Sequence, residues 1–223
     1  RILLKIIKYY KIPNFIFSST AAVYKKFNGK FTEKCKTGSN NSYGKSKIEC
    51  EKEITKELKN TGIKYCILRF FNVSGSVKNY SIGEFHNPET HLIPITINSF
   101  YKNKKIKIYG NNYNTKDGTC LRDYIHVVDL AKSHVAALQY LIKNPKKEVF
   151  NIGTGKGLSV LEAVQCFEKA NNTKIHYEIG PRRDGDVEEI FSDNTKVERL
   201  LNWKAEISLE RAMQDAWNWE LKK

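Results

Sequence analysis

The stretch Ile12-Pro13-Asn14-Phe15-Ile16-Phe17-Ser18-Ser19-Thr20 decides the fold. Residues 12–17 form a short apolar run, which is typical of a buried strand. Apolar residues at helical spacing precede it over residues 1–11, and residues 43–59 and 64–73 repeat the order of helix and strand. Strands that are separated by helices indicate a parallel sheet, so we predict an α/β fold.

Small hydroxyl side chains end this first strand. In open α/β sheets, ligands bind beyond the carboxyl ends of the strands, and Ser18-Ser19-Thr20 lies at such an end. Thr20 can therefore donate a hydrogen bond to a substrate oxygen. The same three residues also fit a polar strand end that only caps a turn.

The segment Ser42-Tyr43-Gly44-Lys45-Ser46-Lys47 begins the next predicted helix. Tyr43 and Lys47 are four residues apart and therefore share one helix face. An ammonium group beside a phenol stabilises the phenolate, and such a phenol can take a proton from a substrate hydroxyl and return it near neutral pH. Tyr43 is thus a candidate base for an oxygen that Thr20 also contacts, although the spacing alone favours a solvated helix face.

Two polar segments each contribute an arginine. Residues 109–127 read as a loop that carries Arg122 to the start of an apolar helix, and Arg183 follows a short strand at residues 175–179. Arginine is suited to bidentate contacts with phosphate, so the two residues could clamp a diphosphate. The alternative is a set of surface ion pairs, Arg122 with Asp123 or Asp117 and Arg183 with Asp186.

Three further features have a structural alternative. Asn72 ends the second strand, where its amide suits a sugar or phosphate oxygen or forms a turn. His126 precedes an apolar helix, and we interpret it as a structural histidine. The glycines of residues 151–157 lack the Gly-Lys-Ser/Thr ending of a nucleoside-triphosphate loop, and we interpret them as a tight turn.

Composition excludes several classes of protein. The chain has 223 residues and a formal net charge of +14, but its lysines are scattered and form no basic helix or aromatic stripe. We therefore expect neither nucleic acid nor a membrane as a partner, and a basic nucleic-acid-binding domain is only a remote alternative. Five cysteines at least 15 residues apart argue against a disulfide framework and a zinc site, and for a reducing compartment, the cytoplasm; we expect no metal. No apolar run approaches the ~20 residues of a membrane span.

The rest of the chain alternates in the same way. We predict helices at residues 92–102, 127–141 and 158–170 and after Ser208, strands at 105–109 and 148–150, and irregular segments at 25–41 and 74–89.

Thr20, Tyr43 and Lys47, in this order and spacing, resemble the catalytic trio of the extended short-chain dehydrogenase/reductase family. Residues 89–94 and 109–127, together with Trp203, resemble the UDP-glucose 4-epimerases (UDP-galactose 4-epimerases) within that family. The resemblance implies a Rossmann-like doubly wound parallel sheet with a smaller C-terminal α/β substrate domain.

The resemblance also implies a division of the chain. Residues 1–73 would be the C-terminal part of an NAD-binding Rossmann domain. Residues 74–223 would mainly bind the UDP-sugar, with roughly 125–155 packing back on the Rossmann sheet. The family's glycine turn, which binds the cofactor pyrophosphate at a helix start, has no counterpart in this sequence. We therefore expect that an N-terminal part is missing and that the chain alone is not the whole enzyme.

The implied reaction is the interconversion of UDP-galactose and UDP-glucose by reversible, NAD-mediated oxidation at sugar C4, in a homodimer. Tyr43 would take the 4-hydroxyl proton, Thr20 would bridge that oxygen and Tyr43, Lys47 would hold the nicotinamide ribose, and Phe71 would lie against the cofactor. The positions implied to hold the UDP-sugar are Asn72, His91, Leu92, Lys107, Ile108, Tyr109, Arg122, Arg183, Asp186 and Ile190. Among these, the two arginines would bind the phosphates and Tyr109 the uracil.

Two positions bear on specificity. Ile190 stands where the family often carries a residue that touches the 2-substituent of the sugar, so its size is expected to decide whether N-acetylated sugars fit. The main alternative activity is that of a nucleotide-sugar 4,6-dehydratase, which has Asp-Glu directly after the small hydroxyl residue. Ala21-Ala22 stands there in this sequence, which disfavours the dehydratase.

Overall fold

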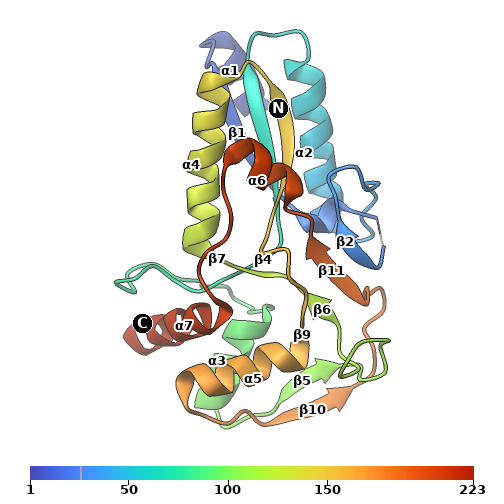
Figure 1. Ribbon diagram of the computed structural model, residues 1–223, viewed down its shortest axis with the longest axis vertical. Coiled ribbons are helices and arrows are strands. Elements are labelled where there is room, and N and C mark those ends of the chain that lie inside the picture. The colour runs from blue at the N-terminus through green and yellow to red at the C-terminus, as the bar shows by residue number, and fades with distance from the viewer. Residues whose placement is uncertain (26) are drawn as a thin grey trace.

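The computed structural model describes residues 1–25 and 27–223 (Figure 1). Its helices are α1 (Ile2–Tyr9), the 3-10 turn η1 (Ala21–Val23), α2 (Ser42–Leu58), α3 (Leu92–Tyr101), α4 (Val127–Lys143), α5 (Val160–Asn171), α6 (Thr195–Leu201) and α7 (Leu209–Lys222). Its strands are β1 (Asn14–Thr20), β2 (Gly29–Phe31), β3 (Lys64–Phe70), β4 (Asn72–Ser74), β5 (Ile106–Tyr109), β6 (Leu121–Arg122), β7 (Tyr124–His126), β8 (Lys147–Ile152), β9 (Leu158–Ser159), β10 (Tyr177–Gly180) and β11 (Glu189–Ser192). Among the described residues, no helix combines the length and the apolar character needed to cross a bilayer.

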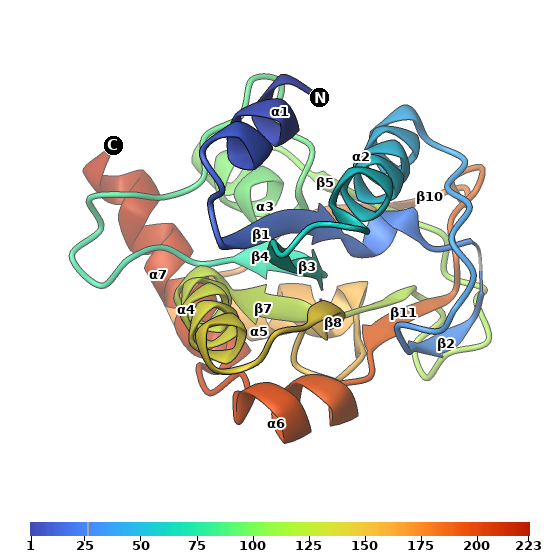
Figure 2. The same ribbon diagram turned by 90° about the horizontal axis from the view of Figure 1, so that it is seen from above.

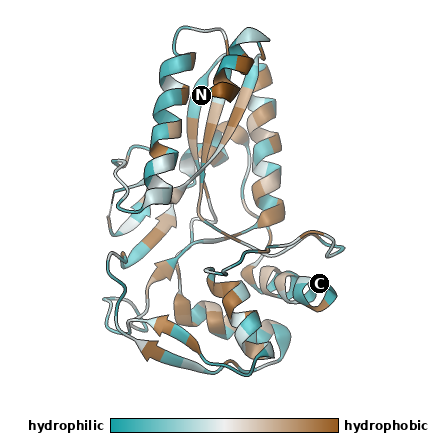
Figure 3. Ribbon diagram, turned by 180° about the vertical axis from the view of Figure 1, so that it is seen from behind, coloured by the Kyte–Doolittle hydropathy of each residue, from teal (hydrophilic) through white to brown (hydrophobic). Residues whose placement is uncertain are grey.

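A parallel three-stranded sheet in the order β1-β3-β8 forms the upper half of the molecule in Figure 1. Successive side chains of a strand point to opposite faces. Tyr65 and Ile67 of β3 accordingly pack with α1 and α2, whereas Cys66 and Leu68 pack with α4 and α6. Figure 2 shows these two helix pairs on opposite sides of the sheet, and Figure 3 shows apolar residues along its strands. The predicted α/β fold with a parallel sheet is confirmed.

The lower half is built from α3, α5 and α7 around the parallel pair β5–β10 (Figure 1). Its core includes Ile97, Ile106, Phe167 and Met213, none of which is more than 2% exposed. Two further groups of strands join this half to the upper sheet: the parallel pair β4–β7 and the sheet β2-β11-β6-β9. The carboxyl ends of β1 and β3 therefore point toward the lower half.

The predicted strand at residues 64–73 is wrong in one respect, because it is two strands. At Phe71 the backbone N–H donates to the carbonyl of Ile152 (3.1 Å), and at Asn72 it donates to the carbonyl of Asp123 (3.0 Å). The chain thus leaves the β1-β3-β8 sheet after Phe70 and pairs with β7 instead. In this position the Asn72 side chain donates a hydrogen bond to the carbonyl of Asp123 (2.9 Å).

Several short elements were not predicted. Residues 25–41, expected to be irregular, contain β2, whose Phe31 is 2% exposed. Residues 109–127, expected to be a loop, contain β6 and β7. Strand β11 and helix α6 were also missed. Strands of two to four residues are too short to display an alternating pattern.

Candidate active site

The start of α2 brings Tyr43 to the end of β1. The helix is capped by Asn41, whose Oδ1 accepts a hydrogen bond from the backbone N–H of Gly44 (2.6 Å). Gly44 has no side chain, so the first turn of α2 can lie directly on the carbonyl of Ala22 and on Ser39, where a Cβ atom would collide. This close approach is what holds the neighbouring Tyr43 beside the residues that follow β1.

Lys47 lies one turn after Tyr43 on the same helix face. Its Nζ donates a hydrogen bond to the carbonyl of Ser18 (2.8 Å) and stands 5.8 Å from the centre of the Tyr43 ring. The ammonium group is therefore fixed between β1 and the phenol. The shared face that the spacing predicted is confirmed.

Thr20 is the last residue of β1 and is 9% exposed. Its Oγ1 accepts a hydrogen bond from the backbone N–H of Ala22 (3.2 Å) and so caps η1. The Thr20 hydroxyl proton is not used by this contact. Both interpretations of this residue thus fit the structure, because Thr20 caps a turn and also keeps a donor for a ligand.

A cavity of about 830 Å³, here called the first cavity, opens at the carboxyl ends of β1 and β3. Thr20, Tyr43, Phe71 and Ile190 are among the residues that line it. Phe71 is only 6% exposed and packs in a small core with Val23, Tyr24 and Phe31. The predicted proton-transfer residues are thus brought to one cavity, although Lys47 stands behind Tyr43 and does not line it.

A second cavity of about 360 Å³ adjoins the first, because Asn72, Val73, Thr90, His91 and Arg122 line both. Nine of the ten positions predicted to hold the UDP-sugar line the second cavity: Asn72, His91, Leu92, Lys107, Ile108, Tyr109, Arg122, Arg183 and Asp186. The tenth, Ile190, lines the first cavity. These residues come from six separate segments of the chain, and the fold gathers them around one continuous cleft.

The two arginines are held in different ways. Arg122 is 16% exposed in its side chain and donates to the carbonyls of Leu121 and Val187 (2.8 Å each) and to Asp186 (3.3 Å). The guanidinium of Arg183 is exposed and stacks on Tyr109, with its carbon 3.8 Å from the ring centre. The ion pairs that we considered are therefore wrong in their partners, since Asp186 faces Arg122 and not Arg183.

Asp123 and Asp117, the other partners considered for Arg122, have structural roles. Asp123 is fully buried and accepts hydrogen bonds from the backbones of Thr154, Gly155 and Ser192. Asp117 accepts from Thr119 and Ser159 at the start of α5. These bonds confirm that residues 151–157 form a structural turn.

His126 is a structural histidine, as predicted. It is 2% exposed, and its Nδ1 accepts a hydrogen bond from the backbone N–H of Val128 (3.0 Å) at the start of α4. With Nδ1 as the acceptor, Nε2 carries the proton and donates to Asp215 (3.2 Å). Burial lowers the pKa of His126, so the neutral ring is favoured in this position.

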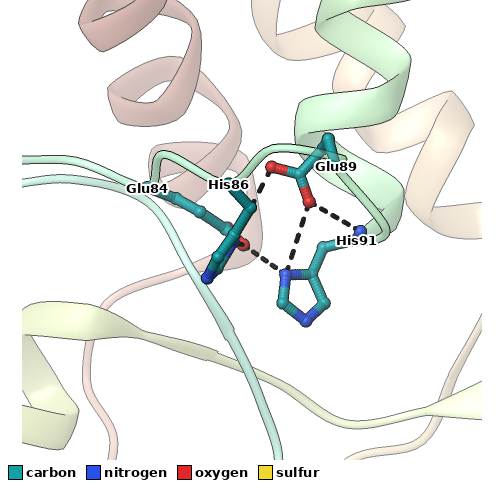
Figure 4. A group of neighbouring side chains, drawn as sticks. All are labelled: Glu84, His86, Glu89 and His91. Atoms are coloured by element: carbon teal, nitrogen blue, oxygen red, sulfur yellow. Dashed lines mark hydrogen bonds and ion pairs between the residues drawn. The ribbon is translucent and has the colours of Figure 1, made fainter.

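The segment before α3 contains a group of side chains of which the sequence analysis named only His91. Figure 4 shows Glu84, His86, Glu89 and His91 gathered there. Glu84 accepts hydrogen bonds from His86 (3.1 Å) and His91, and Glu89 accepts from the backbone N–H of His91 (2.8 Å). The hydrogen bond to Glu84 raises the pKa of His91. Two histidines and two glutamates within eight residues were the available signal.

Known proteins resemble this chain over nearly all of its length. The UDP-glucose 4-epimerase of Lactobacillus helveticus is 42% identical over 209 residues, which cover 92% of this chain and 63% of that protein. This chain thus spans a little less than two thirds of the length of that relative. A crystal structure of UDP-glucose 4-epimerase from Bifidobacterium longum in complex with NAD+ and UDP is 37% identical, with a TM-score of 0.89 over 99% of this chain and 67% of that one.

A second solved structure is even closer in shape. It is a UDP-glucose-4-epimerase from Stenotrophomonas maltophila with bound NAD and formylated UDP-arabinopyranose, with a TM-score of 0.95, 33% identity, and coverage of 99% of this chain and 67% of that one. Residues 1–153 match the family model described as "NAD dependent epimerase/dehydratase family". That match includes β1, α2 and β3 with Thr20, Tyr43 and Lys47. The parallel sheet, the cleft at its carboxyl end and this match together show that the chain belongs to the NAD dependent epimerase/dehydratase family.

Proposed function

We propose that the protein interconverts UDP-galactose and UDP-glucose by reversible oxidation at C4 of the sugar, as part of galactose metabolism and nucleotide-sugar supply. One observation carries the proposal. A hydroxyl pair, Thr20 and Tyr43, lines the first cavity, two arginines line the adjoining second cavity, and five residues are common to both. A cleft with proton-transfer groups at one end and guanidinium groups at the other suits a sugar that is linked to a diphosphate.

The residues present fit the nicotinamide end of NAD. The first cavity opens at the carboxyl ends of parallel strands, where dinucleotides bind in this fold class, and Tyr43, Thr20 and Phe71 line it. Lys47 and Phe71 would hold the nicotinamide ribose and ring. Bound NAD would supply the hydride acceptor for oxidation at C4 and the hydride donor for the return reaction.

Tyr43 moves the proton in this scheme. It takes the proton of the sugar 4-hydroxyl as the C4–H bond breaks, and it returns the proton when the alcohol forms again. The ammonium of Lys47 is held 5.8 Å from the Tyr43 ring centre by its hydrogen bond to the carbonyl of Ser18. Thr20 donates its free hydroxyl proton to the same sugar oxygen and holds it in line with Tyr43.

The second cavity binds the UDP group in our proposal. Arg122 and Arg183 take the phosphates, and Asp186 orients the guanidinium of Arg122 through the 3.3 Å contact. Tyr109 contacts the uracil. Asn72 donates its side-chain amide N–H to the carbonyl of Asp123 (2.9 Å), which leaves its amide oxygen as an acceptor for a sugar hydroxyl.

The geometry does not favour a 4,6-dehydratase. Elimination of water needs a further acid/base pair beside the sugar. Ala21 and Ala22 line the first cavity at the positions considered for that pair, and their methyl groups can neither donate nor accept a proton.

A homodimer is supported by the exposed face of α1. This helix exposes Ile2 (77%), Leu3 (58%), Ile6 (44%) and Tyr9 (79%), and Figure 3 shows its apolar character. Contiguous apolar surface of this kind typically marks an interface, and we propose that a second copy of the protein covers it.

All five cysteine thiols are free, which supports a reducing compartment such as the cytoplasm.

The test uses the full-length protein. It is incubated with UDP-galactose, the formation of UDP-glucose is followed, and the NAD content of the purified protein is measured. We expect conversion, and we expect Tyr43→Phe to lower kcat by roughly 10²–10⁴-fold while retaining NAD. No conversion by the wild-type protein, or full conversion by Tyr43→Phe, would refute the proposed function.

A further inference from the structure

A buried row of polar side chains crosses the upper sheet one position below the candidate proton-transfer residues. In the strand register, Ser19 of β1 pairs with Arg69 of β3, and Arg69 pairs with Asn151 of β8. Ser19 and Asn151 are fully buried and Arg69 is 6% exposed. Residues paired across a sheet share a face, so the three form one layer, here called the polar row.

Glu51 of α2 closes one end of the polar row. Its two carboxylate oxygens accept hydrogen bonds from Nε (3.0 Å) and Nη2 (2.5 Å) of Arg69, which is a bidentate pair. The hydroxyl of Ser19 donates to the same carboxylate at 2.5 Å. One carboxylate on the helix thus binds two neighbouring strands at once.

Tyr24 closes the other end. The guanidinium carbon of Arg69 lies 4.9 Å from the Tyr24 ring centre, and the Tyr24 hydroxyl donates to Oδ1 of Asn151 (2.6 Å). Burial raises the pKa of Tyr24 to about 12, so this phenol stays neutral and keeps its role as a donor. The polar row therefore binds the segment after β1 as well as α2.

The residues that make these contacts lie close to Thr20, Tyr43 and Lys47 in the sequence as well as in space. Tyr43, Lys47 and Glu51 follow one another at intervals of four residues and lie along one face of α2. Lys47 donates to the carbonyl of Ser18, and Glu51 accepts from the hydroxyl of Ser19. Because Thr20 is the next residue, both anchors set the position of α2 directly beside it.

A buried ion pair of this kind is not explained by stability alone. Removing two charges from water is costly, and apolar residues of similar volume often stabilise a core equally well. A fully hydrogen-bonded polar network does give one defined geometry, since a shifted helix would leave buried charges unpaired. The polar row lies directly below the proposed proton-transfer residues, and proton transfer depends on their alignment. A defined geometry of the polar row would maintain that alignment.

We propose that Glu51, held by Arg69 and Ser19, is a positioning residue that keeps Tyr43 and Lys47 of α2 aligned with Thr20 for proton transfer. The inference rests on the proposed function for its catalytic consequence. Its structural consequence, that residues 20–24 and 42–47 are held in place by the polar row, can be measured without any activity.

The mildest test is Ser19→Ala in the full-length protein, because it removes one hydrogen bond of Glu51 and leaves the ion pair intact. Glu51→Leu combined with Arg69→Met removes both charges together and so leaves no unpaired buried charge. Ser133→Ala is the matched control, since Ser133 is also a fully buried serine with one hydrogen bond, to the carbonyl of Leu130 (2.6 Å). Readouts are kcat, KM for UDP-galactose, and amide hydrogen exchange of residues 20–24 and 42–47.

For Ser19→Ala we expect kcat to fall about tenfold or more, KM to change by less than about twofold, and amide exchange to rise in both segments. The double variant is expected to show the same pattern more strongly, and Ser133→Ala to show none of it. If the wild-type protein is active and both variants keep wild-type kcat and exchange, the inference is overturned while the proposed function stands. If the wild-type protein converts no UDP-galactose, the proposed function fails, and the exchange data alone then support or overturn the positioning by the polar row.

Discussion

Replacing Gly44 by alanine has two opposite effects on the start of α2: the higher helix propensity of alanine stabilises the helix, and a steric collision of the added Cβ destabilises it. In an exposed helix, Gly→Ala stabilises by roughly 0.5–1 kcal/mol, because glycine loses more backbone freedom on folding. At Gly44, however, an added Cβ would lie closer than 3.0 Å to the backbone carbonyl of Ala22 and to Ser39. The carbonyl belongs to the segment that follows Thr20 and cannot swing aside as a long side chain would.

The displacement that follows can be bounded. Ordinary contacts of a Cβ atom begin near 3.4 Å, so the first turn of α2 must retreat by at least the difference between 3.4 and 3.0 Å, about 0.4 Å. Tyr43 is the preceding residue and moves with it. Because a misplacement of about 1 Å at a reacting centre can cost about 10²-fold in rate, we expect Gly44→Ala to lower kcat at least severalfold.

The assay compares kcat for UDP-galactose and the melting temperature of Gly44→Ala with those of Gly62→Ala. Gly62 is the matched control, because among the described residues, apart from its own chain neighbours, no atom lies within 4 Å of the position where its Cβ would stand. We expect Gly62→Ala to keep wild-type kcat. An increase in melting temperature with unchanged kcat for Gly44→Ala would show that α2 does not depend on close contact with Ala22, and would refute the reasoning.

Three further predictions follow from the cleft. Arg183→Leu should weaken UDP binding in calorimetry by roughly tenfold to a hundredfold, since a hydrogen bond to a charged group contributes about 1.5–3 kcal/mol. Arg182→Leu is the control and should not weaken it, because the guanidinium of Arg182 binds Asn112 outside the cleft. Equal losses in the two variants would contradict phosphate binding by Arg183. Because Glu84 raises the pKa of His91, their ion pair is complete below the ordinary imidazole pKa of about 6.5 and is lost as pH rises through the raised value. Because His91 lines the second cavity, UDP affinity should fall over that pH range in the wild type. The same pH dependence in a Glu84→Gln variant would contradict a role of the His91–Glu84 ion pair in UDP binding. Ile190→Tyr should lower turnover of UDP-N-acetylglucosamine relative to UDP-galactose, and an unchanged ratio of the two rates would exclude a role for residue 190 in sugar selection.

Sequence reading succeeded where a pattern is long or a spacing is local. The helices at residues 127–141 and 158–170 and after Ser208 were predicted from their apolar stripes, and the common face of Tyr43 and Lys47 follows from helix geometry alone. The relation of Thr20 to Tyr43 required the fold, because 22 residues that contain β2 separate them. The position of Thr20 at a strand end suggested this relation, and the resemblance to a known family supported it; periodicity did not indicate it.

The failures have a common physical cause, which is dependence on distant partners. The strand at residues 64–73 breaks at Phe71 because the carbonyls that it meets belong to Ile152 and Asp123. The partner of Arg122 was wrong because Asp186 lies 64 residues away in sequence. The spacing of nearby residues does not indicate such a distant pair. Asp117 and Asp123 lie closer to Arg122 in sequence, but their carboxylates already accept backbone hydrogen bonds.

Asp123 shows how these distant contacts join the two ends of the cleft. This fully buried carboxylate has no cationic partner among the described residues and is instead satisfied by backbone and hydroxyl donors of Thr154 and Ser192, together with the backbone of Gly155. It follows Arg122 directly, and in the β6–β11 pair Arg122 lies opposite Ile190.

The hydrogen bonds of Asp123 therefore tie together β6, which carries the proposed phosphate-binding Arg122, and β11, which carries the proposed sugar-facing Ile190. They attach both strands to the turn after β8. A Cβ at Gly153 would collide with both Asp123 and Ser192, which explains why a glycine stands at that point of the turn. The proposed phosphate contact and the proposed sugar contact thus share one support, so a substitution that shifts β11 to admit a larger sugar is expected also to move the arginine proposed to bind the diphosphate.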